Sequence, residues 1–241
     1  GFTADKNILD LNKIQILPAQ LTATNKPNIE TNIFNNKISS PILLSPMGHQ
    51  TQFHKQGEVE TARGVNEANS ASFFATQGRM SLDDIRKKNK NSKLSWTIFP
   101  FGNEKWIMQE IENAEANNCF AITICIDANV RSHRYLDREL LTYDARKFGK
   151  RTNPLSPSPE LAVKYDWSLI KKIKKKTKLP LIIKGILTSN DAKKSIDHGA
   201  DALWVSNHGG RMLNSGLSGV DSLIEIKKKI KSKKIKIIVD G

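Results

Sequence analysis

The chain has 241 residues, which is enough for one domain with a sizeable hydrophobic core. Its 38% hydrophobic and 26% charged residues are typical of a folded globular protein, and no apolar run approaches the ~20 residues that a membrane helix needs. The net charge of +14 would also suit a nucleic-acid-binding protein, so the positions of the lysines in the chain matter.

The first 40 residues are rich in Asn, Thr and Lys and predict an irregular cap, with residues 14–21 and 31–34 as a short hairpin that closes the bottom of the fold. Apolar runs then recur along the chain. They predict strands at residues 42–45, 72–76, 94–99, 120–126, 181–184, 202–206 and 235–239.

Helical patterns lie between these strands, at residues 57–69, 103–118, 166–176, 189–198 and 220–231. A further helix begins at the N-cap Ser81, with Asp83 and Asp84 in its first turn. Residues 128–160 contain no clear element and are expected to form a lid-like loop, because loops of that length in a compact domain tend to be functional or disordered.

The strands show no alternation of apolar and polar residues, as expected for parallel strands that are buried on both faces and joined by crossover helices. The alternation of strand and helix predicts an α/β fold, a (β/α)8 TIM barrel. Seven such strands are present, so we expect one domain over residues 1–241, truncated after strand seven.

The lysines concentrate in two helices, at residues 171–176 and 227–234, and aliphatic residues recur between them at helical spacing. This pattern is typical of the solvated outer faces of barrel helices that pack on a sheet. The hypothesis of a nucleic-acid-binding protein is supported by net charge alone, so we expect no specific nucleic-acid partner. We also expect no membrane partner.

Two cysteines, Cys119 and Cys125, flank the strand at residues 120–126 and offer neither a disulfide framework nor metal-ligand spacing. The first residues also lack the hydrophobic segment of a secretory signal. A reducing, cytoplasmic location and the absence of a metal site are the expectations.

The most informative stretch runs over residues 181–211, which read as strand, helix and strand. Lys184 follows the first strand, and the sequence Ser206-Asn207-His208-Gly209-Gly210-Arg211 follows the second. Because parallel strands of a barrel end on one rim, these polar groups are expected to meet there, where catalytic groups collect in such folds.

Lys184-Gly185 followed by this SNHGGR motif resembles the family of FMN-dependent α-hydroxy acid oxidases and dehydrogenases. Residues 41–46 and 57–65 also resemble early segments of the family, with lactate oxidases as its nearest members. The resemblance covers residues 14–241. It implies FMN as the cofactor, a small 2-hydroxy acid as the substrate, and dioxygen or another electron acceptor. It also implies a homo-oligomer, since relatives are commonly tetramers.

The resemblance also assigns roles to individual residues. His208 would be the base that takes the hydroxyl proton of an (S)-2-hydroxy acid such as L-lactate as hydride passes to flavin N5, and Asp127 would orient it. The substrate-binding residues implied are Arg134, Arg211 and Phe99. The cofactor-binding residues implied are Pro46, Met47, Gly48, Thr97, Cys125, Lys184, Ser206, Asp240 and Gly241.

Several positions depart from the family pattern. Thr97, Phe99 and Cys125 stand where the family has a glutamine, a tyrosine and a threonine, and Ala75 and Gln77 replace a serine and an aromatic residue. The Gly- and Arg-rich turn that holds the FMN phosphate in relatives is also not found in this sequence. The alternative to an oxidase is therefore a degenerate or fragmentary family member that no longer binds FMN and is not catalytic.

Overall fold

The computed structural model describes residues 1–21, 26–128, 151–154, 166–232 and 234–241. Its helices are α1 (Phe2–Asn12), η1 (Gln50–Gln52), α2 (Gly57–Glu67), α3 (Leu82–Lys88), α4 (Glu104–Ala116), α6 (Trp167–Lys176), α7 (Ser189–Asp197), η4 (His208–Gly210) and α8 (Gly219–Lys229). Its strands are β1 (Thr31–Ile33), β2 (Asn36–Ile38), β3 (Ala71–Ala75), β4 (Lys93–Ile98), β5 (Ala121–Cys125), β6 (Leu181–Ile186), β7 (Ala202–Val205) and β8 (Lys236–Val239).

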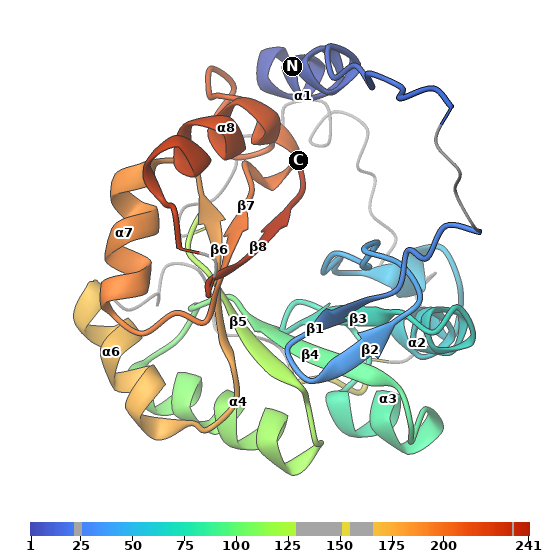
Figure 1. The fold of residues 1–241 in the computed structure, drawn as a ribbon. Helices are drawn as coiled ribbons and strands as arrows, with labels where there is room; N and C mark the ends of the chain where they lie inside the picture. Colours follow the sequence, from blue (N-terminus) through green and yellow to red (C-terminus); the bar gives the residue numbers. More distant parts are fainter. Residues whose placement is uncertain (22–25, 129–150, 155–165, 233) are drawn as a thin grey trace.

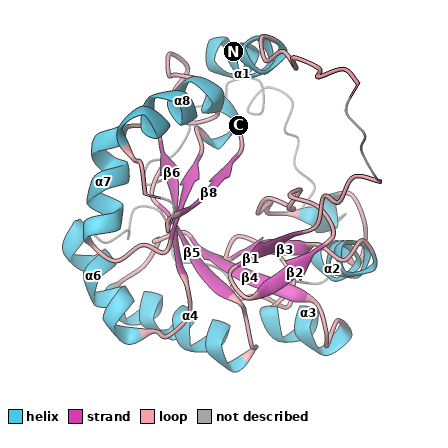
Figure 2. Ribbon diagram, viewed as in Figure 1, coloured by secondary structure: helices cyan, strands magenta, loops and turns pink. Residues whose placement is uncertain are grey.

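Within this described part, β3 to β8 form a six-stranded sheet in sequence order, and every neighbouring pair is parallel. The sheet curves so that its helices lie outside and the strands inside, as Figures 1 and 2 show. The predicted fold, a TIM barrel that is incomplete after its seventh strand, is thus confirmed: the sheet and its helices form an open part of such a barrel. Edge strand β8 lies on one side of the opening.

The outer face of the sheet packs against the helices. Alternate strand residues such as Trp96, Ile122 and Leu203 are fully buried there. The predicted stripe of α4 is confirmed, since Ile107 and Ile111 are also fully buried. Burial of a large aliphatic side chain stabilises a fold by roughly 1.5–3 kcal/mol, so this layer is the main source of stability.

The inner face forms a second, smaller core at the amino-terminal ends of the strands. Phe73 packs edge-to-face on Trp204, with ring centroids 4.7 Å apart, and on Phe120 at 5.6 Å. The hairpin β1–β2 contributes the buried Ile33 and Ile38 to this cluster. The hairpin therefore closes the bottom of the barrel interior.

The N-terminal region differs from the prediction in two ways. Residues 2–12 form helix α1, although irregular structure was expected. The hairpin joins β1 to β2 through register pairs such as Thr31 with Ile38, so the predicted pairing of residues 14–21 with residues 31–34 was wrong. Local propensity in this Asn-rich segment is weak, and α1 is defined instead by tertiary contacts with η4 and α8.

The predicted first strand, residues 42–45, is also wrong as a full strand. A single parallel bridge joins Leu44 to Ser72 beside β3. Ile42 is 74% exposed, so the apolar run at this position is not buried on both faces as the other strands are. The remaining strands lie within two residues of their predicted limits, and Ser81 caps α3 by accepting a hydrogen bond from the Asp84 backbone.

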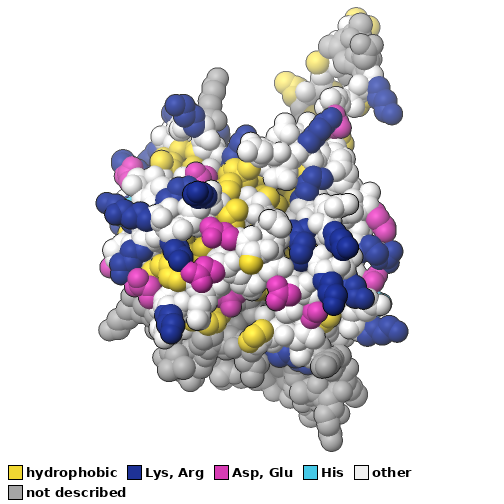
Figure 3. Space-filling model, turned by 90° about the horizontal axis from the view of Figure 1, so that it is seen from below, with side chains coloured by type: hydrophobic (Ala, Val, Ile, Leu, Met, Phe, Trp, Pro, Cys, Tyr) yellow, Lys and Arg dark blue, Asp and Glu magenta, His cyan; other side chains and the backbone are white. Residues whose placement is uncertain are grey.

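The lysines of α6 and α8 lie outside the sheet, as predicted. Several form ion pairs, including Lys172 with Glu104 and Lys176 with Glu112. Figure 3 shows Lys and Arg interspersed with Asp and Glu over the face that it presents. Among the helices that the structure describes, none has the length and apolar character needed to cross a membrane.

Candidate active site

The site lies at the carboxyl ends of the central strands. Because side chains alternate across a strand, Cys125, Lys184 and Ser206 share the inner face while their neighbours face the helices. All three are at most 4% exposed. The predicted convergence of polar groups on one rim is therefore present.

His208, Asp127 and Cys125 form a contiguous cluster on this rim. Nδ1 of His208 lies 3.1 Å from Oδ1 of Asp127, and the Cys125 thiol donates to the same oxygen at 3.0 Å. Sγ of Cys125 lies 3.9 Å from Nδ1 of His208. Oδ2 of Asp127 is buried without a hydrogen-bond partner among the described residues. Because Nδ1 of His208 pairs with Asp127, Nε2 is the ring nitrogen that would exchange a proton with a ligand.

Burial and charge act in opposite directions on this cluster. Burial by itself raises the pKa of Asp127, but the hydrogen bonds from His208 and Cys125 and the nearby charge of Lys184 together outweigh it, so the pKa of Asp127 is below its ordinary value. Burial raises the pKa of the Cys125 thiol well above its ordinary value, and the Asp127 charge adds to this. The cluster therefore holds a carboxylate beside a protonated thiol at neutral pH.

Lys184 is the cation of the site. Its Nζ lies 2.5 Å from Oγ of Ser206 and 3.1 Å from Oδ2 of Asp240, and it sits 5.1 Å from the ring centroid of Trp204. Oδ1 of Asp240 also accepts from this ammonium at 3.3 Å, so Ser206 and both carboxylate oxygens of Asp240 surround it. Ser206 Oγ also accepts the His208 backbone N–H at 3.1 Å, which connects Lys184 to the histidine.

Asp240 joins the two sides of the barrel opening. Besides Lys184, it accepts a hydrogen bond of 2.7 Å from the Ser45 hydroxyl. Residues 46–48, predicted to line the cofactor, follow Ser45 directly. Met47 is 53% exposed, and a Cβ on Gly48 would come 3.3 Å from the Gln77 carbonyl oxygen, so backbone approaches backbone closely here. Gly241 follows Asp240 and is exposed.

The SNHGGR segment forms η4 and its flanks. His208 has φ 58°, a left-handed conformation that is unusual for a residue with a side chain and that clusters at functional sites. Gly210 has φ 70°, and a Cβ there would come 2.6 Å from the Ala4 backbone nitrogen. Arg211 is exposed and donates to the His208 carbonyl oxygen at 3.3 Å.

Helix α1 supports this segment through residues that the sequence analysis did not select. Asn7 and Asn207 exchange amide hydrogen bonds of 3.1 and 2.7 Å, and Asn207 also caps Gly210 at 3.1 Å. Thr3 donates to the Leu213 carbonyl at 2.8 Å. About 200 residues separate Asn7 from Asn207, so no local pattern could have revealed the pair.

Two predicted residues on β4 and just after it also reach the site. The ring of Phe99 lies edge-on to His208, with centroids 5.9 Å apart. Thr97 is fully buried on the inner face, and its hydroxyl has no partner among the described residues. Thr123, its register neighbour on β5, is unpartnered in the same way.

Arg134 and most of the predicted lid at residues 128–160 lie outside the described residues. Residues 151–154 of that segment are described and attach to the loop after β3. Asn153 donates to the carbonyls of Thr76 and Gly78, both at 3.0 Å, and Arg151 donates to Gly78 at 3.2 Å.

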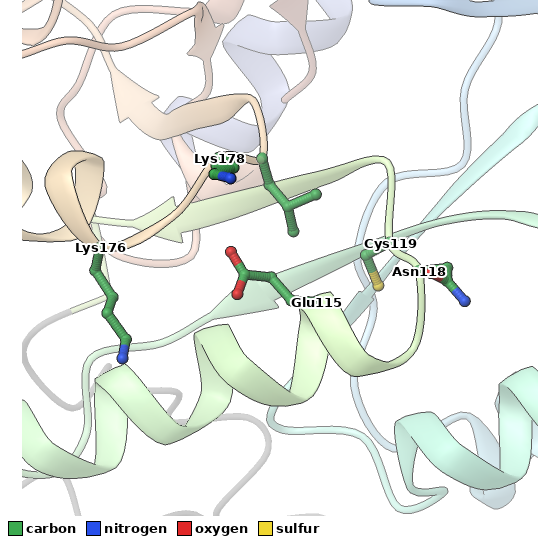
Figure 4. Close-up of a pocket in the computed structure, with 6 residues that line it drawn as sticks. Glu115, Asn118, Cys119, Lys176 and Lys178 are labelled. Atoms are coloured by element: carbon green, nitrogen blue, oxygen red, sulfur yellow. The ribbon is translucent and has the colours of Figure 1, made fainter.

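A hollow occurs at the opposite end of the barrel (Figure 4). It is lined by Glu115, Asn118, Cys119, Lys176, Lys178 and Leu179. These residues lie in the last turns of α4 and α6 or between those helices and strands β5 and β6, so the hollow lies at the amino-terminal ends of the strands, away from His208. In barrels of this class that end serves stability, and chemistry occurs at the other.

Comparison with known proteins agrees with this geometry. The FMN-dependent dehydrogenase family model matches residues 1–241. A 2-hydroxyacid oxidase 2 of Rattus norvegicus is 30% identical over 100% of this chain and 70% of its own length. An L-lactate oxidase of Nostoc is 26% identical over 99% of this chain and 71% of its own length.

Solved structures give the same result. A protein of Pediococcus acidilactici described as a lactate oxidase superposes with a TM-score of 0.88 at 28% identity, covering 100% of this chain and 67% of its own. A mandelate oxidase superposes with a TM-score of 0.87 at 25% identity, covering 100% and 69%. The match of the family model over residues 1–241 shows that the chain belongs to the FMN-dependent dehydrogenase family, whose cofactor is FMN and whose similar members include 2-hydroxy acid oxidases.

Proposed function

We propose that this chain oxidises an (S)-2-hydroxy acid such as L-lactate to the 2-oxo acid, with His208 as the base. The observation that carries the proposal is the His208–Asp127 pair, 3.1 Å apart, on the same rim as the buried Lys184. FMN supplies the two-electron acceptor for this chemistry when it is bound.

His208 has the features of a base for a hydroxyl proton. Asp127 occupies Nδ1, so Nε2 takes the proton, and the ionised carboxylate stabilises the imidazolium that results. The depressed pKa of Asp127 keeps this carboxylate ionised at neutral pH. A positioned base of this kind contributes about 10²–10⁴-fold to rate.

Arg211 is the described residue suited to the substrate carboxylate. It follows His208 by three residues, and its planar guanidinium can pair with a carboxylate through two hydrogen bonds. In the proposal Arg134 acts with it, and Phe99 lies against the substrate beside the imidazole. Ion pairs to the substrate carboxylate would orient the C2 hydroxyl of the substrate toward His208.

The residues on the inner face fit FMN. The hydroxyls of Thr97 and Thr123 are buried and unpartnered, which is costly unless a ligand supplies a polar atom. Lys184 places a positive charge on this face, as a flavin ring edge requires when it gains electrons. Residues 46–48 would line the ring from the other side of the opening, and Ser206, Cys125, Asp240 and Gly241 complete the set.

The test is the visible absorption of the purified chain with FMN, before and after anaerobic addition of L-lactate. We expect a bound-flavin band that bleaches with the substrate and returns when air or an artificial acceptor is admitted. His208→Gln should retain the band and bleach at least about 10²-fold more slowly, because the base is lost. The matched control is His54→Gln, which changes an exposed histidine outside the proposed site and should bleach at the wild-type rate.

Other outcomes are equally informative. A chain that takes up no FMN would contradict the oxidase and support the alternative of a non-catalytic family member. Bleaching with (S)-mandelate but not L-lactate would keep the substrate class and discard the lactate preference. Equal rates of bleaching in wild type and His208→Gln would show that His208 is not the base.

A further inference from the structure

The rim carries a cluster of potential metal ligands that the spacing of residues along the chain does not reveal. Sγ of Cys125, a carboxylate oxygen of Asp127 and a ring nitrogen of His208 all lie within 4.8 Å of one another. Cys125 and His208 are 83 residues apart in sequence, so only the parallel arrangement of β5 and β7 brings them together. Cys125 is also one of the departures from the family pattern, where a threonine is expected.

The distances match one face of a tetrahedron. Zinc binds nitrogen and oxygen at about 2.0–2.2 Å and sulfur at about 2.3 Å, which places N and O ligands roughly 3.3 Å apart and sulfur roughly 3.5 Å from each. The observed separations are 3.0 Å for Sγ to Oδ1, 3.1 Å for Oδ1 to Nδ1 and 3.9 Å for Sγ to Nδ1. Shifts of roughly 0.5 Å would therefore bring the three atoms to ligand positions.

A second observation also indicates a ligand. Asp127 Oδ2 is buried and has no hydrogen-bond partner among the described residues, so a carboxylate lone pair is available at the cluster. Buried unpaired carboxylate oxygens are expensive, and a cation bound by both oxygens of Asp127 would satisfy this one.

Charge and protonation are compatible with a bound dication. Ligation replaces the thiol proton: the Sγ–H bond breaks, its proton passes to solvent, and a metal–Sγ bond forms. The thiolate and the carboxylate then cancel the two charges of the metal. Lys184 is the nearby opposing cation, and Asp240 at 3.1 Å partly neutralises it.

We propose that Cys125, Asp127 and His208 form a three-ligand site for a divalent transition-metal ion of the zinc type, with the fourth position open to water or a small anion. A soft thiolate with one imidazole and one carboxylate favours Zn²⁺ over Mg²⁺ or Ca²⁺. The site belongs to the FMN-free chain, since Cys125 is also on the face assigned to the flavin.

Metal binding would prevent His208 from acting as the base. Coordination takes the lone pair of Nδ1, so the single ring proton of the neutral imidazole moves from Nδ1 to Nε2, and Nε2 can no longer accept a proton. This consequence rests on the proposed function, whereas metal binding itself does not.

The test is a titration of the full chain with Co²⁺ and then Zn²⁺, after dialysis against a chelator. Cobalt reports a thiolate ligand by charge-transfer absorption in the near ultraviolet and four-coordination by intense visible bands. We expect one equivalent of Co²⁺ to produce both signals and one equivalent of Zn²⁺ to abolish them.

Two variants identify the ligands. Cys125→Thr should lose the charge-transfer band and weaken Zn²⁺ binding by more than the roughly 10–100-fold that loss of a ligand's hydrogen-bond partner costs. Asp127→Asn should weaken binding as well and serves as the second variant if Cys125→Thr does not fold by circular dichroism. The matched control is Cys119→Ser, which changes the other buried cysteine, at the opposite end of the barrel (Figure 4), and should bind like wild type.

The outcomes separate the two proposals. Absence of a cobalt spectrum in the wild-type chain, or a charge-transfer band that persists in Cys125→Thr, would overturn the metal site whatever the oxidase assay shows. Metal binding in a chain that fails to bleach FMN would support the metal site and contradict only the oxidase proposal.

Discussion

Lys184 illustrates how one residue takes its role from three neighbours. Ser206 and Asp240 hold its ammonium from two directions, and Trp204 lies beneath it. Burial of a charged group is costly unless such partners surround it. The arrangement places the Lys184 ammonium, whose residue is 4% exposed, where the flavin ring edge is proposed.

Replacement of Lys184 by Met should weaken FMN binding. A hydrogen bond to a charged group contributes about 1.5–3 kcal/mol, which corresponds to roughly a 10- to 100-fold rise in Kd. Quenching of FMN fluorescence on titration with protein measures this directly. Lys193→Met, on the exposed face of α7, is the control and should leave Kd unchanged. Equal affinities for both variants would remove Lys184 from the cofactor site.

At the scale of elements, helix α1 determines the shape of the loop that carries His208. Its residues Thr3 and Asn7 bind that loop, and its charged side chains bind α8. Asp10 is 4% exposed and accepts from Lys13 at 2.7 Å and from Lys6, while Lys6 also pairs with Asp221 at 2.5 Å. The hydrogen bonds from Lys13 and then from Lys6 and Ser218 place the pKa of Asp10 far below its ordinary value.

Asp10→Asn should therefore loosen α1 at neutral pH. A carboxyl whose pKa is lower in the folded state stabilises the fold above its unfolded value, about 3.9, and loses that contribution as pH falls below it. Hydrogen exchange of the α1 amides should be faster in Asp10→Asn than in wild type at pH 7, and the difference should shrink below about pH 4. Asp5→Asn changes a side chain that is 74% exposed and should exchange like wild type. A difference that persists unchanged into acid would show that the charge of Asp10 is not the cause.

For the molecule as a whole, two hydrophobic layers hold the open sheet. The outer layer binds the helices, and the inner layer around Phe73 joins β3, β7 and the β1–β2 hairpin. Across the opening of the sheet, the Ser45–Asp240 hydrogen bond joins the Leu44 segment to the end of β8, in place of a strand ladder. We therefore expect the inner layer to contribute much of the stability on this side of the fold.

Phe73→Ala should destabilise the fold by about 3–5 kcal/mol, because the cavity beside Trp204 cannot collapse fully. Urea unfolding followed by tryptophan fluorescence measures the change. Phe53→Ala, which alters a ring that is 80% exposed, should change stability by no more than about 0.5 kcal/mol. A loss of less than about 1 kcal/mol for Phe73→Ala would mean that the inner layer is not a cooperative part of the core.

The sequence by itself determined the βα order, the parallel sheet and the rim position of Lys184 and His208. These follow from physics that is local: apolar runs without alternation require burial on both faces, and parallel strands place their carboxyl ends together. The caps of α3 and the buried stripe of α4 are local in the same sense.

The tertiary structure alone decided the rest. Helix α1 has weak propensity and is stabilised by η4 and α8. In the described part of the chain the residue 42–45 segment pairs through one bridge to Ser72, and the hairpin packs its buried residues on the inner core. The same is true of the Asn7–Asn207 pair and of the meeting of Cys125 with Asp127 and His208. Contacts between residues far apart in the chain depend on how the sheet curves, and no pattern in a single stretch of sequence contains that information.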